Sequence, residues 1–262
     1  MRLSGGDCSA VLDPADGGRM TSFVAAGHEL LVKDGRDMFH YGNFVLAPWV
    51  GRLRDATLRY EEGTYRFPPN DPPNAVHGLV TGRPWKVASD GQLAVELADP
   101  WPWSGRVLQS VSLGDGRADF RIEVHADEPM PIAVGWHPWF TRRLVTADGI
   151  SADVVLDVEP GRMYGNDQAG LPTGKLVAPV PPPWDYCFVD LAKPPVLRWP
   201  GTLELTVSSE LSHWVLYDRE DAGVCVEPWT GPPNSLNMPD PSVVRPGQPL
   251  VATMTWTWRT IG

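Results

Sequence analysis

Thr253-Met254-Thr255-Trp256-Thr257-Trp258, close to the C-terminal end of the sequence, alternates threonine with a large apolar residue. Successive side chains of a β-strand point to opposite faces, so this period of two places the three apolar residues on one side and the threonines on the other. The stretch 252–258 therefore predicts a strand with one buried face. Strands of this kind build sheets that pack on one another.

Short runs of β-branched or aromatic residues recur along the chain, usually bounded by Gly, Pro or Asp. Two such runs flank Glu61-Glu62-Gly63 and predict a hairpin whose turn uses the glycine. No amphipathic helix longer than about two turns is evident, and no repeat of fixed period favours a propeller. The pattern predicts an all-β fold, a large sandwich of mostly antiparallel strands with few short helices. The predicted strands are 57–60, 64–67, 93–97, 107–113, 118–124, 154–158, 203–207, 214–217 and 252–258.

Two Pro-rich stretches, 67–74 and 179–184, interrupt the strand pattern. A flexible linker is one interpretation of each, but strand patterning resumes unchanged afterwards. Ordered loops at strand ends, where all-β proteins often carry binding groups, fit better. Residues 1–262 are therefore expected to form a single domain.

Composition excludes several classes of protein. The chain has 262 residues with a formal net charge of −10, which opposes binding to a phosphate backbone. No uncharged apolar run approaches the roughly 20 residues that a bilayer span needs, so no membrane association is expected. Cys8, Cys187 and Cys225 are odd in number and scattered, and the N-terminus lacks an apolar leader. These features predict a cytoplasmic protein with reduced thiols and a small-molecule partner.

Two histidines and one glutamate stand in unusual settings. His77 lies in Asn74-Ala75-Val76-His77-Gly78 and His137 in Gly135-Trp136-His137-Pro138-Trp139-Phe140, so both imidazoles are expected near strand ends or loops. Glu227 ends the apolar run Val224-Cys225-Val226 and precedes Pro228-Trp229-Thr230-Gly231-Pro232-Pro233-Asn234. Partial desolvation there would raise its pKa toward neutrality, as a general base requires. Structural alternatives are a core or capping histidine and an ion-paired glutamate.

Aromatic residues gather in the same segments. Asp185 lies in Trp184-Asp185-Tyr186-Cys187-Phe188 and is either a turn residue or a ligand. Aromatic faces pack on the apolar face of a sugar while polar side chains bind its hydroxyls, so this coincidence favours a carbohydrate pocket. Most individual tryptophans nevertheless suit the core. The tryptophans in question are Trp49, Trp85, Trp136, Trp139, Trp184 and Trp229.

Other kinds of site lack support in the sequence. Metal-ligand spacings such as HxxxH or CxxC are missing, as are the GxSxG nucleophile elbow and the GxxxxGK[ST] phosphate loop. We therefore expect neither a metal nor a cofactor. The remaining histidines have no comparable neighbours and are not assigned a function: His28, His40, His125 and His213.

At these residues the chain resembles the aldose 1-epimerase (mutarotase) family. The motifs that carry the resemblance extend from about residue 17 to 258, and the ordered combination is more specific than any one of them. In order they are Gly17-Gly18-Arg19-Met20-Thr21-Ser22-Phe23, Gly27-His28-Glu29-Leu30-Leu31, Ala47-Pro48-Trp49-Val50-Gly51-Arg52-Leu53, Asn74-Ala75-Val76-His77-Gly78-Leu79 with Arg83-Pro84-Trp85, Gly135-Trp136-His137-Pro138-Trp139-Phe140, Asp185-Tyr186-Cys187-Phe188, the 227–234 stretch, and Pro246-Gly247.

The resemblance implies a galactose-mutarotase-like β-supersandwich with an open sugar-binding cleft. It implies Glu227 as catalytic base and His137 as catalytic acid, with His77 assisting at the ring oxygen. Anomer exchange needs such a pair, because one group removes the O1 proton while another protonates the ring oxygen. We also expect the carboxylate of Glu227 to keep His137 protonated near neutral pH.

The resemblance further implies substrate-binding residues. Arg52 and Asp185 would hold sugar hydroxyls, and Trp139 and Trp229 would contact the ring. One position departs from the family pattern: Gly51 stands where asparagine usually precedes the arginine. The missing side-chain amide is expected to affect which sugar binds more than which reaction is catalysed.

Three alternative functions remain open. An epimerase of hexose 6-phosphates would need a basic clamp for the phosphate. A non-catalytic sugar-binding protein would need no matched acid and base. A glycoside hydrolase would need two carboxyls about 5–10 Å apart, for which Asp185 and Glu227 are the candidates. The candidate clamp residues are Arg52, Arg54, Arg83, Arg142 and Arg143.

Overall fold

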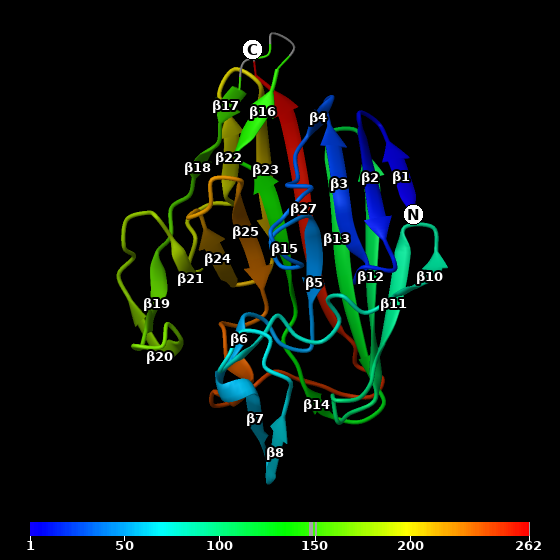
Figure 1. The fold of residues 1–262 in the computed structure, drawn as a ribbon, viewed down its shortest axis with the longest axis vertical. Coiled ribbons are helices and arrows are strands. Elements are labelled where there is room, and N and C mark those ends of the chain that lie inside the picture. Colours follow the sequence, from blue (N-terminus) through cyan, green and yellow to red (C-terminus); the bar gives the residue numbers. More distant parts are fainter. Residues whose placement is uncertain (147–148, 150, 262) are drawn as a thin grey trace.

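The structure is a computed structural model that describes residues 1–146, 149 and 151–261 (Figure 1). Two large sheets, of eleven and eight strands, dominate it. The helical part of the described residues is limited to two 3₁₀ turns, η1 (Arg54–Ala56) and η2 (Ser235–Asn237). The all-β class is thus confirmed. No helix among these residues has the length and hydropathy that crossing a bilayer requires.

The larger sheet is antiparallel and is assembled from both halves of the chain. Its strands, in spatial order, are β1 (Arg2–Gly5), β2 (Cys8–Asp13), β3 (Arg19–Ala25), β5 (Asn43–Leu46), β15 (Gly135–Thr141), β25 (Gly223–Trp229), β24 (His213–Tyr217), β21 (Asp185–Val189), β19 (Arg162–Asn166) and β20 (Pro172–Val177), with β4 (His28–Glu29) paired to β3.

The smaller sheet is also antiparallel. Its order is β10 (Lys86–Ser89), β11 (Gln92–Leu97), β12 (Gly105–Gly114), β13 (Arg117–Ala126), β27 (Leu250–Thr260), β23 (Leu203–Ser209), β22 (Val196–Trp199) and β18 (Val155–Asp157). Four two-stranded ladders complete the fold: β6 (Arg52–Leu53) with β9 (Ala75–Val76), β7 (Thr57–Tyr60) with β8 (Gly63–Arg66), β14 (Met130–Pro131) with β26 (Val243–Val244), and β16 (Arg143–Val145) with β17 (Ser151–Asp153).

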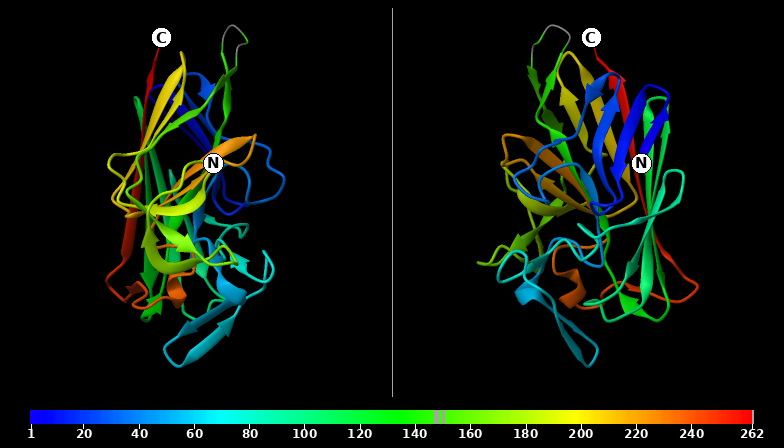
Figure 2. Two further views of the ribbon diagram at one scale, coloured as in Figure 1. Left: turned by 90° about the vertical axis from the view of Figure 1, so that its left-hand side faces the viewer. Right: turned by 45° about the vertical axis from the view of Figure 1, so that its right-hand side comes forward.

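Strand β27 explains why the two sheets pack face to face. Ala252, Met254, Trp256 and Trp258 are buried, and the threonines between them face outward, as the sequence period predicts. Trp256 contacts two aromatic rings of the larger sheet, Phe23 on β3 and Phe140 on β15, with ring centroids 5.0 and 4.9 Å away. In the left view of Figure 2, β27 lies along the left edge with the larger sheet to its right. An aromatic core therefore fills the space between the layers.

The predicted strands correspond closely to those of the structure. Each predicted segment overlaps one strand, and most strands extend slightly beyond it, although β8 ends one residue before the end of the segment 64–67 and β18 lies within the segment 154–158. The hairpin β7–β8 is confirmed, but the role given to its glycine is wrong. Glu61 adopts the positive φ of 51°, whereas Gly63 already pairs with Tyr60 in the ladder. A two-residue turn needs its positive φ at a central position, which Gly63 does not occupy.

The packing predicts a large effect for one core substitution. Trp256→Ala removes a fully buried ring that contacts aromatic residues of both sheets, so it should lower the free energy of unfolding by about 3–5 kcal/mol. Thr253→Ala on the exposed side of the same strand is the control, with an expected change within about 0.5 kcal/mol. Denaturant unfolding followed by fluorescence measures both. Equal effects would contradict the assignment of an inner and an outer face to β27.

Candidate functional site

The site lies on the face of the larger sheet that is turned away from the smaller sheet. The ladder between β15 and β25 pairs Gly135 with Trp229 and Trp139 with Cys225, so His137 and Glu227 stand opposite each other between them. Because side chains alternate along β15, Phe140 enters the core while His137 and Trp139 project to the other face. Two neighbouring strands thus present an imidazole and a carboxylate to the same space.

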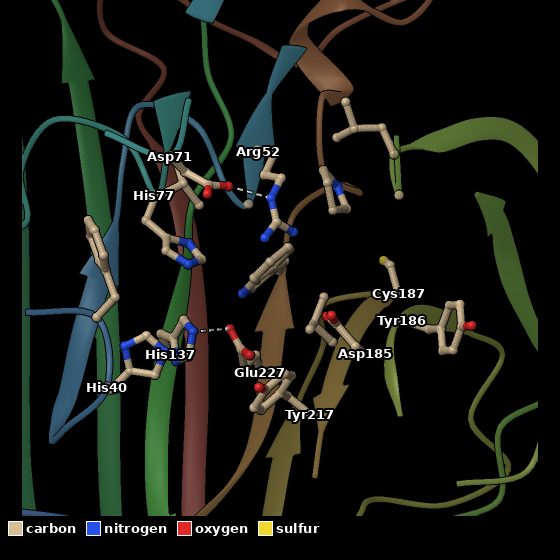
Figure 3. Close-up of a pocket in the computed structure, with 18 of the residues that line it drawn as sticks. His40, Arg52, Asp71, His77, His137, Asp185, Tyr186, Cys187, Tyr217 and Glu227 are labelled. Atoms are coloured by element: carbon tan, nitrogen blue, oxygen red, sulfur yellow. Dashed lines mark hydrogen bonds and ion pairs between the residues drawn. The ribbon is translucent and has the colours of Figure 1, made fainter. Parts of the chain in front are cut away.

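His137 and Glu227 form a close, buried pair (Figure 3). Nε2 of His137 lies 3.5 Å from Oε2 of Glu227, and the two residues are 7% and 2% exposed. The ring of Phe44 stacks on the imidazole at 4.8 Å with an interplanar angle of 17°, and Trp139 lies nearly parallel to it at 5.7 Å. These stacked rings restrict the orientation of the imidazole.

The pair opens into a cavity of about 380 Å³. This volume is within the range of small-ligand sites, about 300–1,000 Å³. The lining comes from segments far apart in the sequence, between residues 36 and 233. Every site residue predicted from the sequence contributes to it: Arg52, His77, His137, Trp139, Asp185, Glu227 and Trp229.

His77 stands beside His137 in the cavity wall. Their rings meet edge to face at 4.9 Å, and Nδ1 of His77 is buried without a hydrogen-bond partner. The backbone at His77 has a positive φ of 62°, and the following Gly78 approaches the carbonyl of Ala47 so closely that a Cβ would overlap it. The His-Gly pair therefore reflects a tight turn that directs the imidazole inward. Burial, aided by electrostatic interactions with Arg52 and His40, lowers the pKa of His77 to about 3.

Arg52 and Asp185 lie at the more exposed part of the cavity, each with an ionic partner. Nε of Arg52 is 2.6 Å from Oδ2 of Asp71, and Nη1 of Arg219 is 3.6 Å from Oδ2 of Asp185. Their side chains are 44% and 42% exposed, in contrast to Glu227. The cavity thus combines a buried pair at its base with charged hydrogen-bonding groups nearer to solvent.

The two predicted tryptophans form part of the cavity wall. Trp139 and Trp229 are buried, and their indole N–H groups donate to the carbonyls of Phe39 and Trp136 at 2.6 and 3.2 Å. Other tryptophans of the same segments do belong to the core, as expected for most of them; Trp49, Trp85 and Trp136 are all buried.

One electrostatic expectation is wrong. Burial lowers the pKa of His137 well below the ordinary imidazole value, and electrostatic interactions with His77, His40 and Arg19 act in the same direction. Burial likewise raises the pKa of Glu227 well above its ordinary value, with a further contribution from Asp185. The loss of solvation outweighs attraction within the pair, so His137 is not held as an imidazolium near neutral pH.

The sequence analysis missed several cavity residues. His40, which was left unassigned, lines the cavity and pairs through Nδ1 with Asp37 at 2.6 Å. Asp71 and Tyr217 were not singled out either, although Asp71 lies in the Pro-rich loop 67–74 that was expected to carry binding groups. No local motif distinguishes His40, because only the fold brings the loop 33–42 over the sheet.

A buried arginine holds that loop in place. Arg19 is fully buried, and its guanidinium donates to the carbonyls of Met38 and Tyr41 at 2.6 and 2.7 Å and to Asp16 at 2.8 Å. Its Cζ also lies over the rings of Tyr41 and Phe44, 4.2 and 4.4 Å from their centroids. Phe44 in turn stacks on His137, so Arg19 of the Gly17-Gly18-Arg19 motif supports the site through Phe44.

The departure at Gly51 has a structural counterpart. The residue lines the cavity with a φ of 57°, a conformation that asparagine also tolerates. A Cβ at this position would stand 2.9 Å from the ring of Pro233 and 3.1 Å from Trp229. Pro233 and Trp229 therefore occupy the space that the Cβ of an asparagine would need.

Three buried residues could together hold a metal ion. His137, Cys225 and Glu227 each offer one ligand atom, and these atoms lie within 4.8 Å of one another. Such a set of nitrogen, sulfur and oxygen donors suits Zn²⁺ chemically. The expectation of no metal rested on spacing along the sequence, which does not detect ligands contributed by adjacent strands.

Comparison with known proteins agrees with this architecture. Three solved structures share the fold: an aldose epimerase homologue from C. elegans (TM-score 0.82, 15% identity, 100% of this chain and 99% of that one), a galactose mutarotase-like protein from Clostridium acetobutylicum (0.81, 19%, 99% and 95%) and a galactose 1-epimerase from Lactobacillus acidophilus NCFM (0.79, 14%, 99% and 93%).

Sequence comparison gives the family directly. The uncharacterized protein YihR of Escherichia coli K12 is 24% identical over 232 residues, which span 76% of this chain and 72% of YihR. Residues 4–190 match the profile that describes aldose 1-epimerases. Since this match covers well over half of its length, the chain belongs to the aldose 1-epimerase family.

Proposed function

We propose that the protein interconverts the α and β anomers of a free hexose, with Glu227 and His137 as the proton-transfer pair. The main support is the placement of these two groups 3.5 Å apart at the buried base of a cavity of sugar size. Family membership implies an isomerase-type enzyme, and the similar structure from Lactobacillus acidophilus is named a galactose 1-epimerase. We further propose that residues 1–262 act as one catalytic domain in the cytoplasm.

In the proposed reaction Glu227 takes the proton of the C1 hydroxyl while His137 gives a proton to the ring oxygen. The C1–O5 bond breaks with its electron pair moving to O5, and C1 and O1 form the carbonyl of the open-chain aldehyde. Rotation about C1–C2 exposes the other face of this carbonyl. Closure then reverses both proton transfers, so the pair returns to its starting state without consuming a proton or a redox equivalent.

The shifted pKa values are compatible with this scheme. Burial raises the pKa of Glu227 and lowers the pKa of His137, so it favours the form in which a single shared proton lies on the carboxyl. The same protonation state follows ring opening, when Glu227 has gained a proton and His137 has lost one. Polar groups of a bound sugar would favour the charged form by hydrogen bonding to the carboxylate, and the protonated imidazole can then act as the acid.

The cavity favours an uncharged sugar over a hexose 6-phosphate. Of the five arginines considered for a phosphate clamp, Arg83, Arg142 and Arg143 bind carbonyls or Asp153 elsewhere and do not line the cavity. Arg52 and Arg54 lie nearer, but each is paired with an aspartate. Three of the candidate clamp residues therefore lie away from the cavity, and the charges of the other two are balanced by aspartates.

A pure sugar-binding role is less well supported. Hydroxyl recognition alone would not call for a carboxyl that is 2% exposed and has one oxygen without a hydrogen-bond partner. Burying such a group destabilises the fold, and groups of this kind occur mainly at functional sites.

The first prediction concerns Glu227. Glu227→Gln should lower kcat for anomer exchange by at least about 10²-fold, because the amide cannot accept the O1 proton. The fold should persist, since burial already favours the uncharged carboxyl. Saturation-transfer NMR of glucose and galactose measures the rate, with Glu96→Gln on the exposed surface as the matched control. An unchanged rate in the Glu227 variant would refute the proposed base.

The second prediction concerns pH. The profile of kcat/KM should be bell-shaped, since a second proton or the loss of the single proton both disable the pair. Protonation of His137 occurs only well below 6.5, so kcat/KM should stay level as the pH falls through 6.5. The alkaline decrease should begin well above 4.5, where Glu227 loses its proton. Rates corrected for spontaneous exchange would contradict this if the acid limb had its midpoint near 6.5.

The third prediction concerns metals. Activity should survive EDTA, because an acid and a base can each supply roughly 10²–10⁴-fold without a Lewis acid. Cys225→Ala should likewise retain activity, since it removes only a potential metal ligand. Metal analysis of the treated protein verifies removal. Loss of activity with EDTA and its recovery on adding Zn²⁺ would instead assign His137, Cys225 and Glu227 to a metal centre.

A further inference from the structure

A buried thiol lies beside the proposed proton-transfer pair. Cys225 and Glu227 are two residues apart on β25, so their side chains project from the same face of the sheet. One ligand atom from each of these residues and one from His137 lie within 4.8 Å of one another. We propose that the three side chains form an inhibitory site for thiophilic divalent cations such as Zn²⁺. The inhibition, though not the binding, rests on the proposed function.

Two aromatic rings separate the thiol from the cavity. Cys225 pairs with Trp139 on β15 and with Tyr217 on β24, and both of these residues line the cavity, whereas Cys225 is 0% exposed. The rings of Trp139 and Tyr217 meet edge to face, with their centroids 5.6 Å apart. A ligand of the sulfur must therefore be small, because it has to pass between these rings or beside the Glu227–His137 pair.

The arrangement of the donor atoms suits a tetrahedral ion. With bonds of about 2.0–2.3 Å, a tetrahedral Zn²⁺ separates its ligand atoms by roughly 3.3–3.6 Å. Nε2 of His137 and Oε2 of Glu227 already lie 3.5 Å apart (Figure 3). The limit of 4.8 Å on the other separations leaves at most about 1 Å of closure, which small side-chain rotations can supply. A fourth position would face the cavity.

The charges of the site would balance around such an ion. Bound as thiolate and carboxylate, Cys225 and Glu227 contribute two negative charges, which match a divalent cation and reduce the free-energy cost of burying all three. Oε2 of Glu227 is buried and makes no hydrogen bond to the described residues, so this oxygen is available as a ligand. The nitrogen, sulfur and oxygen donors suit Zn²⁺, whereas Mg²⁺ prefers oxygen ligands.

Occupation of the site would stop proton transfer. The ion takes Nε2 of His137 and a carboxylate oxygen of Glu227, and these two groups carry the protons in the proposed reaction. Nδ1 of His137 finds no acceptor among the described residues, whereas metal-ligating histidines almost always donate this other N–H. The site is therefore suited to a cation that binds reversibly and inhibits, rather than to a resident cofactor.

The first test compares Zn²⁺ binding with inhibition. EDTA-treated and dialysed protein is titrated with Zn²⁺ by calorimetry, and anomer exchange of galactose and glucose is followed by saturation-transfer NMR. At a free Zn²⁺ concentration ten times the measured dissociation constant, the rate should fall about 10-fold, because the cation then occupies the pair in most molecules. EDTA should restore the rate, and Mg²⁺ at the same concentration should leave it unchanged. Inhibition that does not follow the binding curve would overturn the inhibitory assignment.

Substitution of the thiol gives the matched comparison. Cys225→Ser replaces the sulfur with an oxygen of similar size, and Cys225→Ala removes the donor. Both variants should keep the metal-free rate within about 2-fold and weaken Zn²⁺ binding at least about 10-fold. Cys8→Ala, at a buried cysteine that does not line the cavity, is the control and should bind Zn²⁺ as the unsubstituted protein does. Equal Zn²⁺ affinity in all of these proteins would overturn the site.

A spectroscopic measurement identifies the sulfur ligand without relying on catalysis. Co²⁺ accepts the same donors as Zn²⁺, and a coordinated thiolate adds a charge-transfer band in the near ultraviolet. The unsubstituted protein and Cys8→Ala should show this band on addition of Co²⁺, and Cys225→Ser should not. Addition of Co²⁺ to the unsubstituted protein without the band would overturn the site. The band together with no anomer exchange of any sugar by the metal-free protein would retain the site and reject the proposed function.

Discussion

The pairing of β15 with β25 is the constraint on which the site depends. Register alone places His137 across from Glu227, and a shift of one residue in either strand would turn one of them into the aromatic core. The register is held by residues that face the other way, since Phe140 packs on Trp256 of the smaller sheet. The core between the sheets and the chemistry on the outer face therefore use alternate residues of the same two strands.

The fold and much of the site could be predicted from the sequence because their signals are local. The threonine alternation of β27 and the β-branched runs report directly on strands with one buried face. Motifs such as His77-Gly78 reflect a backbone that only certain residues permit, so they mark the turn and the imidazole together. Each of these patterns involves only a few neighbouring residues, so it can be recognised without knowing which distant residues they contact.

The parts that were missed or mistaken depend on contacts between distant segments. His40 reaches the cavity only because its loop folds over the sheet, and the grouping of Cys225 with His137 and Glu227 arises across strands. The expectation that His137 is protonated near neutral pH was wrong for a related reason. A pairwise attraction can be inferred from neighbouring motifs, whereas the depth of burial that opposes it belongs to the whole fold.

The anchoring of residues 36–40 through Arg19 has a consequence for how ligands arrive. A guanidinium bound to three backbone or carboxylate oxygens and enclosed by two rings keeps this part of the wall assembled in the free protein. Ligand entry then requires little loss of chain entropy, since this segment is already ordered. Encounter and escape of a ligand should accordingly be governed by diffusion and desolvation.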